Sequence, residues 1–139
     1  MKILQATEEL VTNLEVLEWS QRYIENTEQT KEHKLPNNLK QLMTPLTQYL
    51  QDTPAGTQCS SSLQSLFTQL EKFQLTVGEL QMIANQRPNS VLQLLCILFD
   101  CERRFTEEEM AGILQIIDTT LEPSPIKGEV DMQSTPNSL

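Results

Sequence analysis

Few side chains in this sequence could do chemistry, and their spacing argues against a catalytic or metal site. His33 is the single histidine and stands in a polar stretch far in sequence from any cysteine, so a Ser-His or Cys-His dyad has no supporting context. The three cysteines, Cys59, Cys96 and Cys101, lack the paired spacing of a zinc site. We therefore expect a solvated histidine, and we expect Cys96 and Cys101 to be structural thiols.

The acidic run from Glu107 to Glu109 is the remaining candidate for a catalytic or metal-binding cluster. Carboxylates in the first turn of a helix complement the positive end of the helix dipole, which is the simpler explanation here. The four glycines form neither a phosphate-binding loop nor a dinucleotide fingerprint. We expect no enzyme activity, no cofactor and no metal ion, and a function in holding partner proteins.

The net charge excludes several other kinds of partner. At −9 the field of the molecule repels nucleic-acid phosphates and anionic membrane surfaces, so we expect no direct DNA binding and no membrane contact. The longest apolar run, residues 91–99, is far shorter than the ~20 residues of a membrane helix. The first ten residues lack the apolar stretch of a signal peptide, and the cysteine number is odd. Both features favour a reducing intracellular compartment.

One local pattern predicts three helix starts. Thr12, Thr76 and Thr106 are each preceded by an apolar residue, followed three residues later by Glu, and four residues later by another apolar residue. The Thr and Glu of such a pattern form a capping box, and the two apolar residues form a hydrophobic staple.

Apolar spacing then predicts an all-α protein. The first helix runs from Thr12 to about Thr27. Thr44 as cap with Pro45 in the first turn predicts a second helix over 44–53. Four further helices are predicted at about 63–73, from Thr76 to before Pro88, over 91–99 and over 106–121. The helix over 91–99 is apolar nearly all round, which is typical of a central helix.

The pattern divides the chain into four parts. Residues 1–30 comprise a short extended arm and one helix, residues 31–43 a polar linker, residues 44–121 a helical domain, and residues 122–139 a disordered tail. The arm and first helix have too little core to be stable alone, so something must cover them.

Two blocks of residues resemble a known family. The first is Met1-Lys2-Ile3-Leu4 with Ala6, Leu10 and the run Thr12 to Val16. The second contains Leu75-Thr76, Glu79, Asn85, Arg87-Pro88 and the run Cys101 to Glu108. In order and spacing, both blocks resemble the small HRDC-fold stalk subunit of RNA polymerase III. The second block also resembles the paralogous subunit of RNA polymerase II, whereas the spacing from Met1 to Asn13 resembles the polymerase III form.

The resemblance implies a non-catalytic subunit with a helical domain of HRDC type. It implies a stalk formed with an OB-fold subunit on the polymerase III core, contacts with initiation factors, and a location in the nucleus. We expect five residues to contribute to the contact with the OB-fold partner: Ile3, Leu4, Leu14, Leu17 and Trp19. Two alternatives stay open: that these residues pack on the chain's own helices, and that the protein is a free-standing helical adaptor or signalling module.

Overall fold

The computed structural model describes residues 10–29 and 36–123, and every regular element in these two ranges is helical. The all-α prediction is therefore confirmed. Residues 1–9 and 124–139, with the expected arm and most of the expected tail, lie outside the described residues. The elements in chain order are α1 (Asn13–Gln29), α2 (Asn37–Gln51), η1 (Pro54–Gly56), α3 (Ser60–Leu70), η2 (Glu71–Phe73), α4 (Val77–Gln86), α5 (Val91–Ile97), α6 (Cys101–Arg104) and α7 (Glu107–Thr120).

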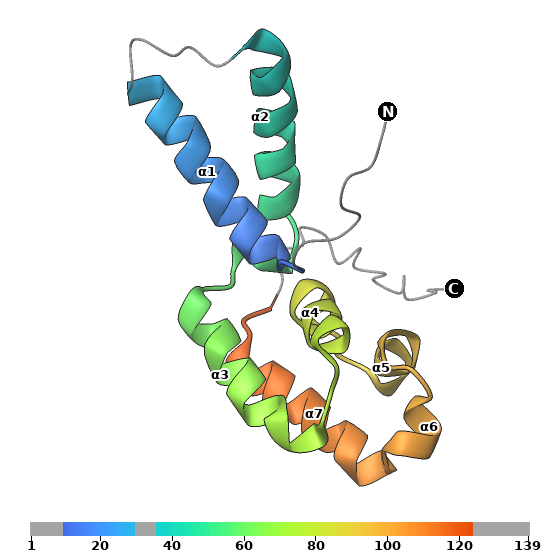
Figure 1. Cartoon of the computed structure of the whole chain (residues 1–139). Helices are drawn as coiled ribbons and strands as arrows, with labels where there is room; N and C mark the ends of the chain where they lie inside the picture. Colours follow the sequence, from blue (N-terminus) through green and yellow to red (C-terminus); the bar gives the residue numbers. More distant parts are fainter. Residues whose placement is uncertain (1–9, 30–35, 124–139) are drawn as a thin grey trace, which may run out of the picture.

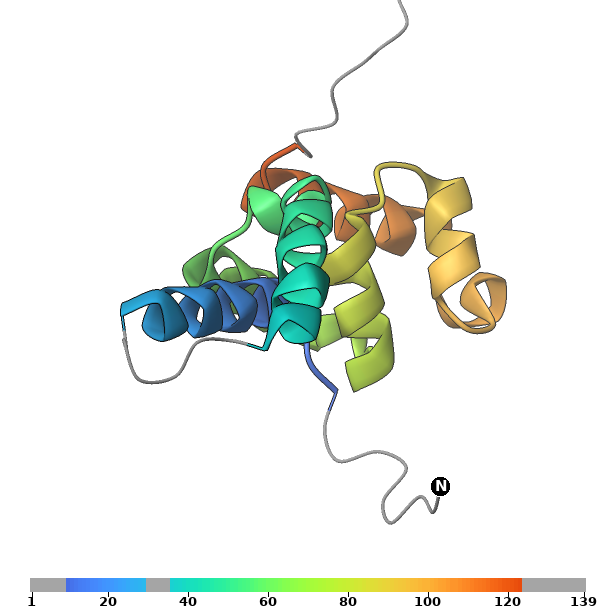
Figure 2. The ribbon, with the colours of Figure 1, turned by 90° about the horizontal axis from the view of Figure 1, so that it is seen from above.

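The helices of the described residues form two groups. The helices α1 and α2 run in opposite directions and form a hairpin that projects from the other five helices (Figure 1). In the second group α3 lies along α7, while α5 and α6 lie at the end farthest from the hairpin (Figures 1 and 2). The short helix η1 contacts α1, α2 and α4, and so joins the hairpin to the second group.

The three predicted helix caps are all formed. The Thr12 hydroxyl accepts from the amide of Glu15 at 3.3 Å, and the Glu15 carboxylate accepts from the amide of Thr12 at 2.6 Å. Thr76 with Glu79, and Thr106 with Glu109, form the same reciprocal pair at the starts of α4 and α7. These local signals placed three of the helix starts correctly because each pair satisfies backbone donors that the helix leaves free.

The start of α2 corrects a prediction. The helix begins at Asn37 rather than at a Thr44 cap, so Pro45 lies inside it, and residues 37–43 of the expected linker are helical. An internal proline removes one backbone hydrogen bond and crowds the preceding turn. The helix persists because its first half packs on α1: Met43 is 3 % exposed, although it precedes the proline. Tertiary packing therefore outweighs the local signal.

The position of α5 corrects another prediction. The helix is short and lies at the edge of the second group rather than in its centre. Only one side is covered: Leu94 is 0 % exposed, whereas Leu92 is 72 % exposed. The chain turns back at Asp100, which has a left-handed backbone with φ 49°, and begins α6, a helix that the apolar pattern did not predict. Cys96 and Cys101 therefore belong to different helices, and only Cys101 is buried.

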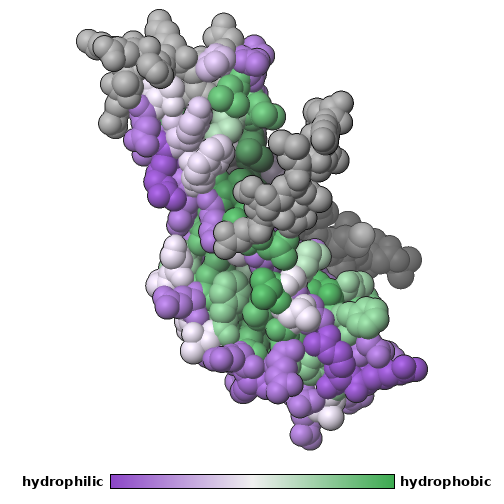
Figure 3. Space-filling model, viewed as in Figure 1, coloured by the Kyte–Doolittle hydropathy of each residue, from purple (hydrophilic) through white to green (hydrophobic). Residues whose placement is uncertain are grey.

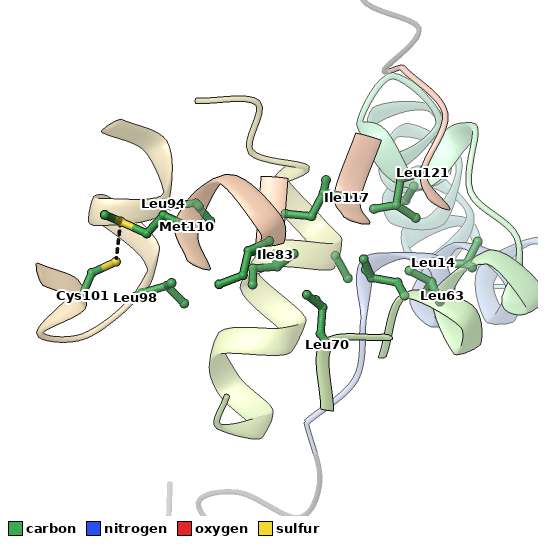
Figure 4. Close-up of a cluster of buried hydrophobic side chains, with 14 of the residues drawn as sticks. Leu14, Leu63, Leu70, Ile83, Leu94, Leu98, Cys101, Met110, Ile117 and Leu121 are labelled. Atoms are coloured by element: carbon green, nitrogen blue, oxygen red, sulfur yellow. Dashed lines mark hydrogen bonds between the residues drawn. The ribbon is translucent and has the colours of Figure 1, made fainter. Parts of the chain in front are cut away.

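The core runs through the second group and reaches the base of the hairpin. Figure 4 shows the central side chains Leu70, Ile83 and Ile117 between a cluster from α5 and α6 on one side and Leu14 and Leu63 on the other. The buried residues of α3 and of α7 with its cap follow helical spacing. They are Leu63, Leu66, Leu70, Met110, Ile113, Ile117 and Leu121.

Candidate partner-binding surface

The contact between α1 and α2 is narrow and leaves much of the hairpin uncovered. On α1, Leu17 and Ser20 are 4 % and 0 % exposed; on α2, Met43 and Leu50 are similarly buried. The hydroxyl of Thr47 donates to Ser20 Oγ at 3.0 Å, which places these two side chains opposite each other across the hairpin. The two helices therefore meet along these stripes.

A second apolar stripe flanks the contact on each helix. Successive residues of a helix are turned by about 100°, so Val16, Trp19 and Tyr23 lie about a quarter turn from the contact stripe of α1. On α2, Leu42, Leu46 and Tyr49 are offset by about the same angle in the same sense. Equal offsets in two antiparallel helices bring both stripes to one face. The hairpin face is therefore defined by Val16, Trp19, Tyr23, Leu42, Leu46 and Tyr49.

Much of this hairpin face is open to solvent. Trp19 is 53 % exposed, Leu42 is 63 % exposed and Tyr49 is 68 % exposed. The rings of Trp19 and Tyr23 stack with their centroids 5.4 Å apart and their planes inclined by 24°. Stacked aromatic side chains lose little further freedom on binding, and Trp and Tyr are the residues most enriched among binding hot spots. The face therefore suits a protein partner.

An apolar groove lies next to the base of α1. It has a volume of about 440 Å³ and is walled by the start of α1, by α3 and by α4. Leu10 and Val77 on its rim are 54 % and 65 % exposed, and Leu63, Phe67 and Leu80 form its apolar wall. Figure 3 shows apolar residues over α2 and over the second group of helices on one side of the molecule, bordered by polar residues along the outer side of α1.

An ion pair with a buried carboxylate holds α4, α5 and α6 together. The carboxylate of Glu79, only 7 % exposed, accepts from both terminal nitrogens of Arg104, at 2.5 and 3.1 Å. It also accepts from the amide of Phe99 at 3.2 Å while capping α4. The hydrogen bonds from Arg104 are the main reason that the pKa of Glu79 falls to about 2. One carboxylate thus joins α4, the turn after α5, and α6.

Two further polar side chains join distant segments. Arg87, left-handed at the end of α4, donates to the carbonyl of Leu121 and to Asp118, and so caps the end of α7. Asn85 accepts from the amide of Asn13 at 2.8 Å, which ties α4 to the start of α1. Glu79, Asn85, Arg87 and Arg104 all belong to the block of residues that carried the family resemblance. Their contacts are within the chain, which gives them a structural role.

Within residues 10–29 and 36–123 no group of His, Cys, Asp or Glu side chains could hold a metal ion, and no helix is long and apolar enough to cross a membrane. Cys59 is exposed, and hydrogen bonds from the Ser61 and Ser62 hydroxyls lower the pKa of its thiol to about 7. The Cys59 thiol forms a hydrogen bond with the Ser61 hydroxyl at 3.0 Å, and the Cys59 backbone amide donates to the Ser62 hydroxyl at 3.1 Å.

The five predicted contact residues do not lie on one surface of the structure. Leu14 and Leu17 are 5 % and 4 % exposed in this chain's own core, which was the open alternative for them. Trp19 is exposed on the hairpin face, and Ile3 and Leu4 lie outside the described residues. The apolar residues of α2 on this face were not predicted as contacts. The seven-residue interval between Leu42 and Tyr49 was the available signal, but the expected helix start at Thr44 interrupted it.

Comparison with known proteins places the chain among transcription proteins. The family model described as RNA polymerase Rpb4 matches residues 10–121, which include every described helix. The chain is 26 % identical over 131 residues to DNA-directed RNA polymerase III subunit rpc9 of Schizosaccharomyces pombe, with 86 % of this chain and 98 % of the relative covered. It is 28 % identical over 117 residues to the protein of the same name from Dictyostelium discoideum, with 79 % and 85 % covered.

Proposed function

Because the chain belongs to the RNA polymerase Rpb4 family, we propose that it is a non-catalytic subunit of RNA polymerase III that forms the stalk with an OB-fold subunit. The observation that carries the proposal is the agreement between the family match and the two relatives, which share one name and align along most of their length. A polymerase subunit of this kind supports initiation through contacts with initiation factors and works in the nucleus, where the polymerase is.

The hairpin face is the surface that we assign to the OB-fold subunit. It combines exposed aromatic and aliphatic side chains on two helices, and the stacked pair of Trp19 and Tyr23 gives it an ordered centre. Ile3 and Leu4 remain in the proposal because they precede Leu10 at the rim of the groove beside α1. Leu14 and Leu17 support the surface from the core beneath it.

The charge of the chain supports a scaffold role within the polymerase. With a formal charge of −9, the subunit repels nucleic-acid backbones, so contacts with RNA are left to the OB-fold partner and no direct DNA binding is expected. The subunit would instead bind proteins: its stalk partner, the polymerase III core and the initiation factors.

Co-expression of the full chain with the OB-fold stalk subunit of the same polymerase tests the proposal. The wild type should purify as a one-to-one complex. The double variant Trp19→Ala/Tyr49→Ala should bind at least about thirtyfold more weakly, because hot-spot truncations cost about 2 kcal/mol or more. Both side chains are exposed, so the fold should survive.

A control variant and a second test variant accompany this measurement. Leu92→Lys changes an equally exposed apolar residue far from the hairpin and should leave the complex intact. Ile3→Ser/Leu4→Ser should weaken it. If the Trp19 and Tyr49 variant binds like the wild type, the hairpin face is the wrong surface. If the wild type does not bind the OB-fold subunit, the stalk assignment fails.

A further inference from the structure

A second apolar surface lies at the end of the molecule opposite the hairpin. A groove of about 720 Å³ opens between α5, α6 and the start of α7. Val91, Leu95, Phe105 and Met110 supply its apolar lining. None of these residues belongs to the hairpin face, and none is among the five residues that we expected to contact the OB-fold partner.

The groove continues onto the exposed side of α5. Val91 and Leu95 stand one helical turn apart, and Leu92 lies beside them on the same side of the helix. Val91 is 41 % exposed and Leu92 is 72 % exposed, and Phe99, in the turn that follows α5, is 82 % exposed. An apolar strip that extends beyond a groove along a helix fits an elongated partner better than a small molecule. It is the form of groove into which an amphipathic helix docks.

The rim of the groove is acidic. Glu102 and Glu107 line it, and Glu108 follows on the exposed first turn of α7. Of the two nearby arginines, Arg104 is ion-paired with Glu79, and Arg103 lies 3.9 Å from Asp100. The local charge is therefore negative. A second copy of this chain would bring the same carboxylates against themselves, and a phosphate backbone would be repelled as well.

We propose that this groove binds an amphipathic helix of a partner protein whose apolar residues enter the groove and whose flanking residues are Lys or Arg. The inference rests on the proposed function, which places the partner protein in the transcription machinery. In that function the stalk partner covers the hairpin face, and the groove between α5, α6 and α7 stays free. The subunit would act as a connector with one apolar surface at each end.

Titration of the isotopically labelled full chain with two synthetic helical peptides tests the proposal. Both peptides carry leucines at positions i, i+3, i+4 and i+7; one has lysines beside the leucines and the other has glutamates. The lysine peptide should shift the amide resonances of Leu92, Leu95 and Phe105 but not that of Trp19, and its affinity should fall with added salt. The glutamate peptide should not bind.

Three variants of exposed residues complete the test. Leu92→Lys should weaken the lysine peptide at least about tenfold, because it removes an apolar contact and adds a like charge. Glu102→Gln/Glu107→Gln should weaken it about fivefold. Leu42→Lys, at a similarly exposed position on the hairpin face, is the matched control and should leave the affinity for the lysine peptide unchanged.

Three results would overturn the inference. The first is equal affinity for the two peptides. The second is an equal loss of affinity for the lysine peptide in Leu92→Lys and in Leu42→Lys. The third is self-association of the chain that Leu92→Lys abolishes. Failure here leaves the one-to-one complex with the OB-fold subunit unaffected, because that complex is measured through the hairpin face. The two proposals can therefore fail separately.

Discussion

Glu79 and Arg104 are twenty-five residues apart in the sequence and form a two-pronged ion pair that is largely buried. The same Glu79 carboxylate caps α4 and accepts from the Phe99 amide, and Arg104 also donates to the Phe99 carbonyl. The pair therefore holds the turn between α5 and α6 against α4. The helices α5 and α6 on either side of this turn line the groove that we propose as a second binding surface.

Removal of one member of this pair should destabilise the fold. Arg104→Ala leaves the Glu79 carboxylate buried without its main partner, so the free energy of unfolding should fall by about 2 to 3 kcal/mol. Urea denaturation followed by circular dichroism measures this loss. Arg103→Ala is the matched control, because Arg103 is 85 % exposed and its nearest carboxylate is 3.9 Å away. Equal losses for the two variants would contradict the structural role of the pair.

The same pair predicts how stability depends on pH. Hydrogen bonds from Arg104 lower the pKa of Glu79 to about 2, whereas the ordinary value is 4.5. A carboxyl group with a depressed pKa in the folded state stabilises the protein above its unfolded pKa, and that contribution disappears as the pH falls from about 4.5 toward 2. The difference in unfolding free energy between wild type and Glu79→Gln should be constant near pH 7 and shrink over that interval. A difference that grows on acidification would contradict the ion pair.

The helix caps at the starts of α4 and α7 should each contribute measurably. Thr76→Ala and Thr106→Ala remove a hydroxyl that accepts from the amide of Glu79 or Glu109, so each should lower the unfolding free energy by ~1 kcal/mol. Thr68→Ala is a suitable comparison because Thr68 is exposed in the last turn of α3, where its hydroxyl donates to a helical carbonyl. Thermal melts in which all three variants lose the same amount would count against the caps.

Pro45 lies inside the observed α2, whereas it would lie in the first turn of the helix that we expected from Thr44. Inside a helix, proline costs a backbone hydrogen bond, so Pro45→Ala should raise the unfolding free energy by ~1 kcal/mol or more, even after the loss of proline's rigidity in the unfolded chain. At the first turn of a helix starting at Thr44, the same change would be neutral or destabilising. Chemical denaturation of the wild type and this one variant decides between the two starts.

Local chemistry in the sequence predicts much of the fold. The Thr and Glu pairs identify helix starts because both partners lie within one turn. The stripe of Leu63, Leu66 and Leu70 identifies a buried face because its spacing is helical. The start of α2 and the edge position of α5 depend on which helices lie beside them, which no local pattern encodes. The apolar sequence of α5 predicts burial on all sides, whereas the structure leaves Leu92 exposed as part of a candidate binding surface.

The candidate surface was predictable only in part for the same reason. Trp19, one of the five expected contact residues, is exposed on the hairpin face, whereas Leu14 and Leu17 face the chain's own core. The contribution of Leu42 and Tyr49 becomes visible only when α2 is placed antiparallel to α1. The ion pair between Glu79 and Arg104 likewise depends on a turn that brings α6 against α4, and the sequence spacing of the two residues does not encode it.

The size and composition of the native assembly show whether this chain works as a subunit of RNA polymerase III. A tagged copy expressed at its natural level should elute from a sizing column at the mass of a polymerase, with the OB-fold subunit and the polymerase III core present in equal amount. The Trp19→Ala/Tyr49→Ala variant should shift toward the free chain, whereas Leu92→Lys should not. Elution of the wild type alone near its own mass of 15.9 kDa would contradict its membership in the polymerase.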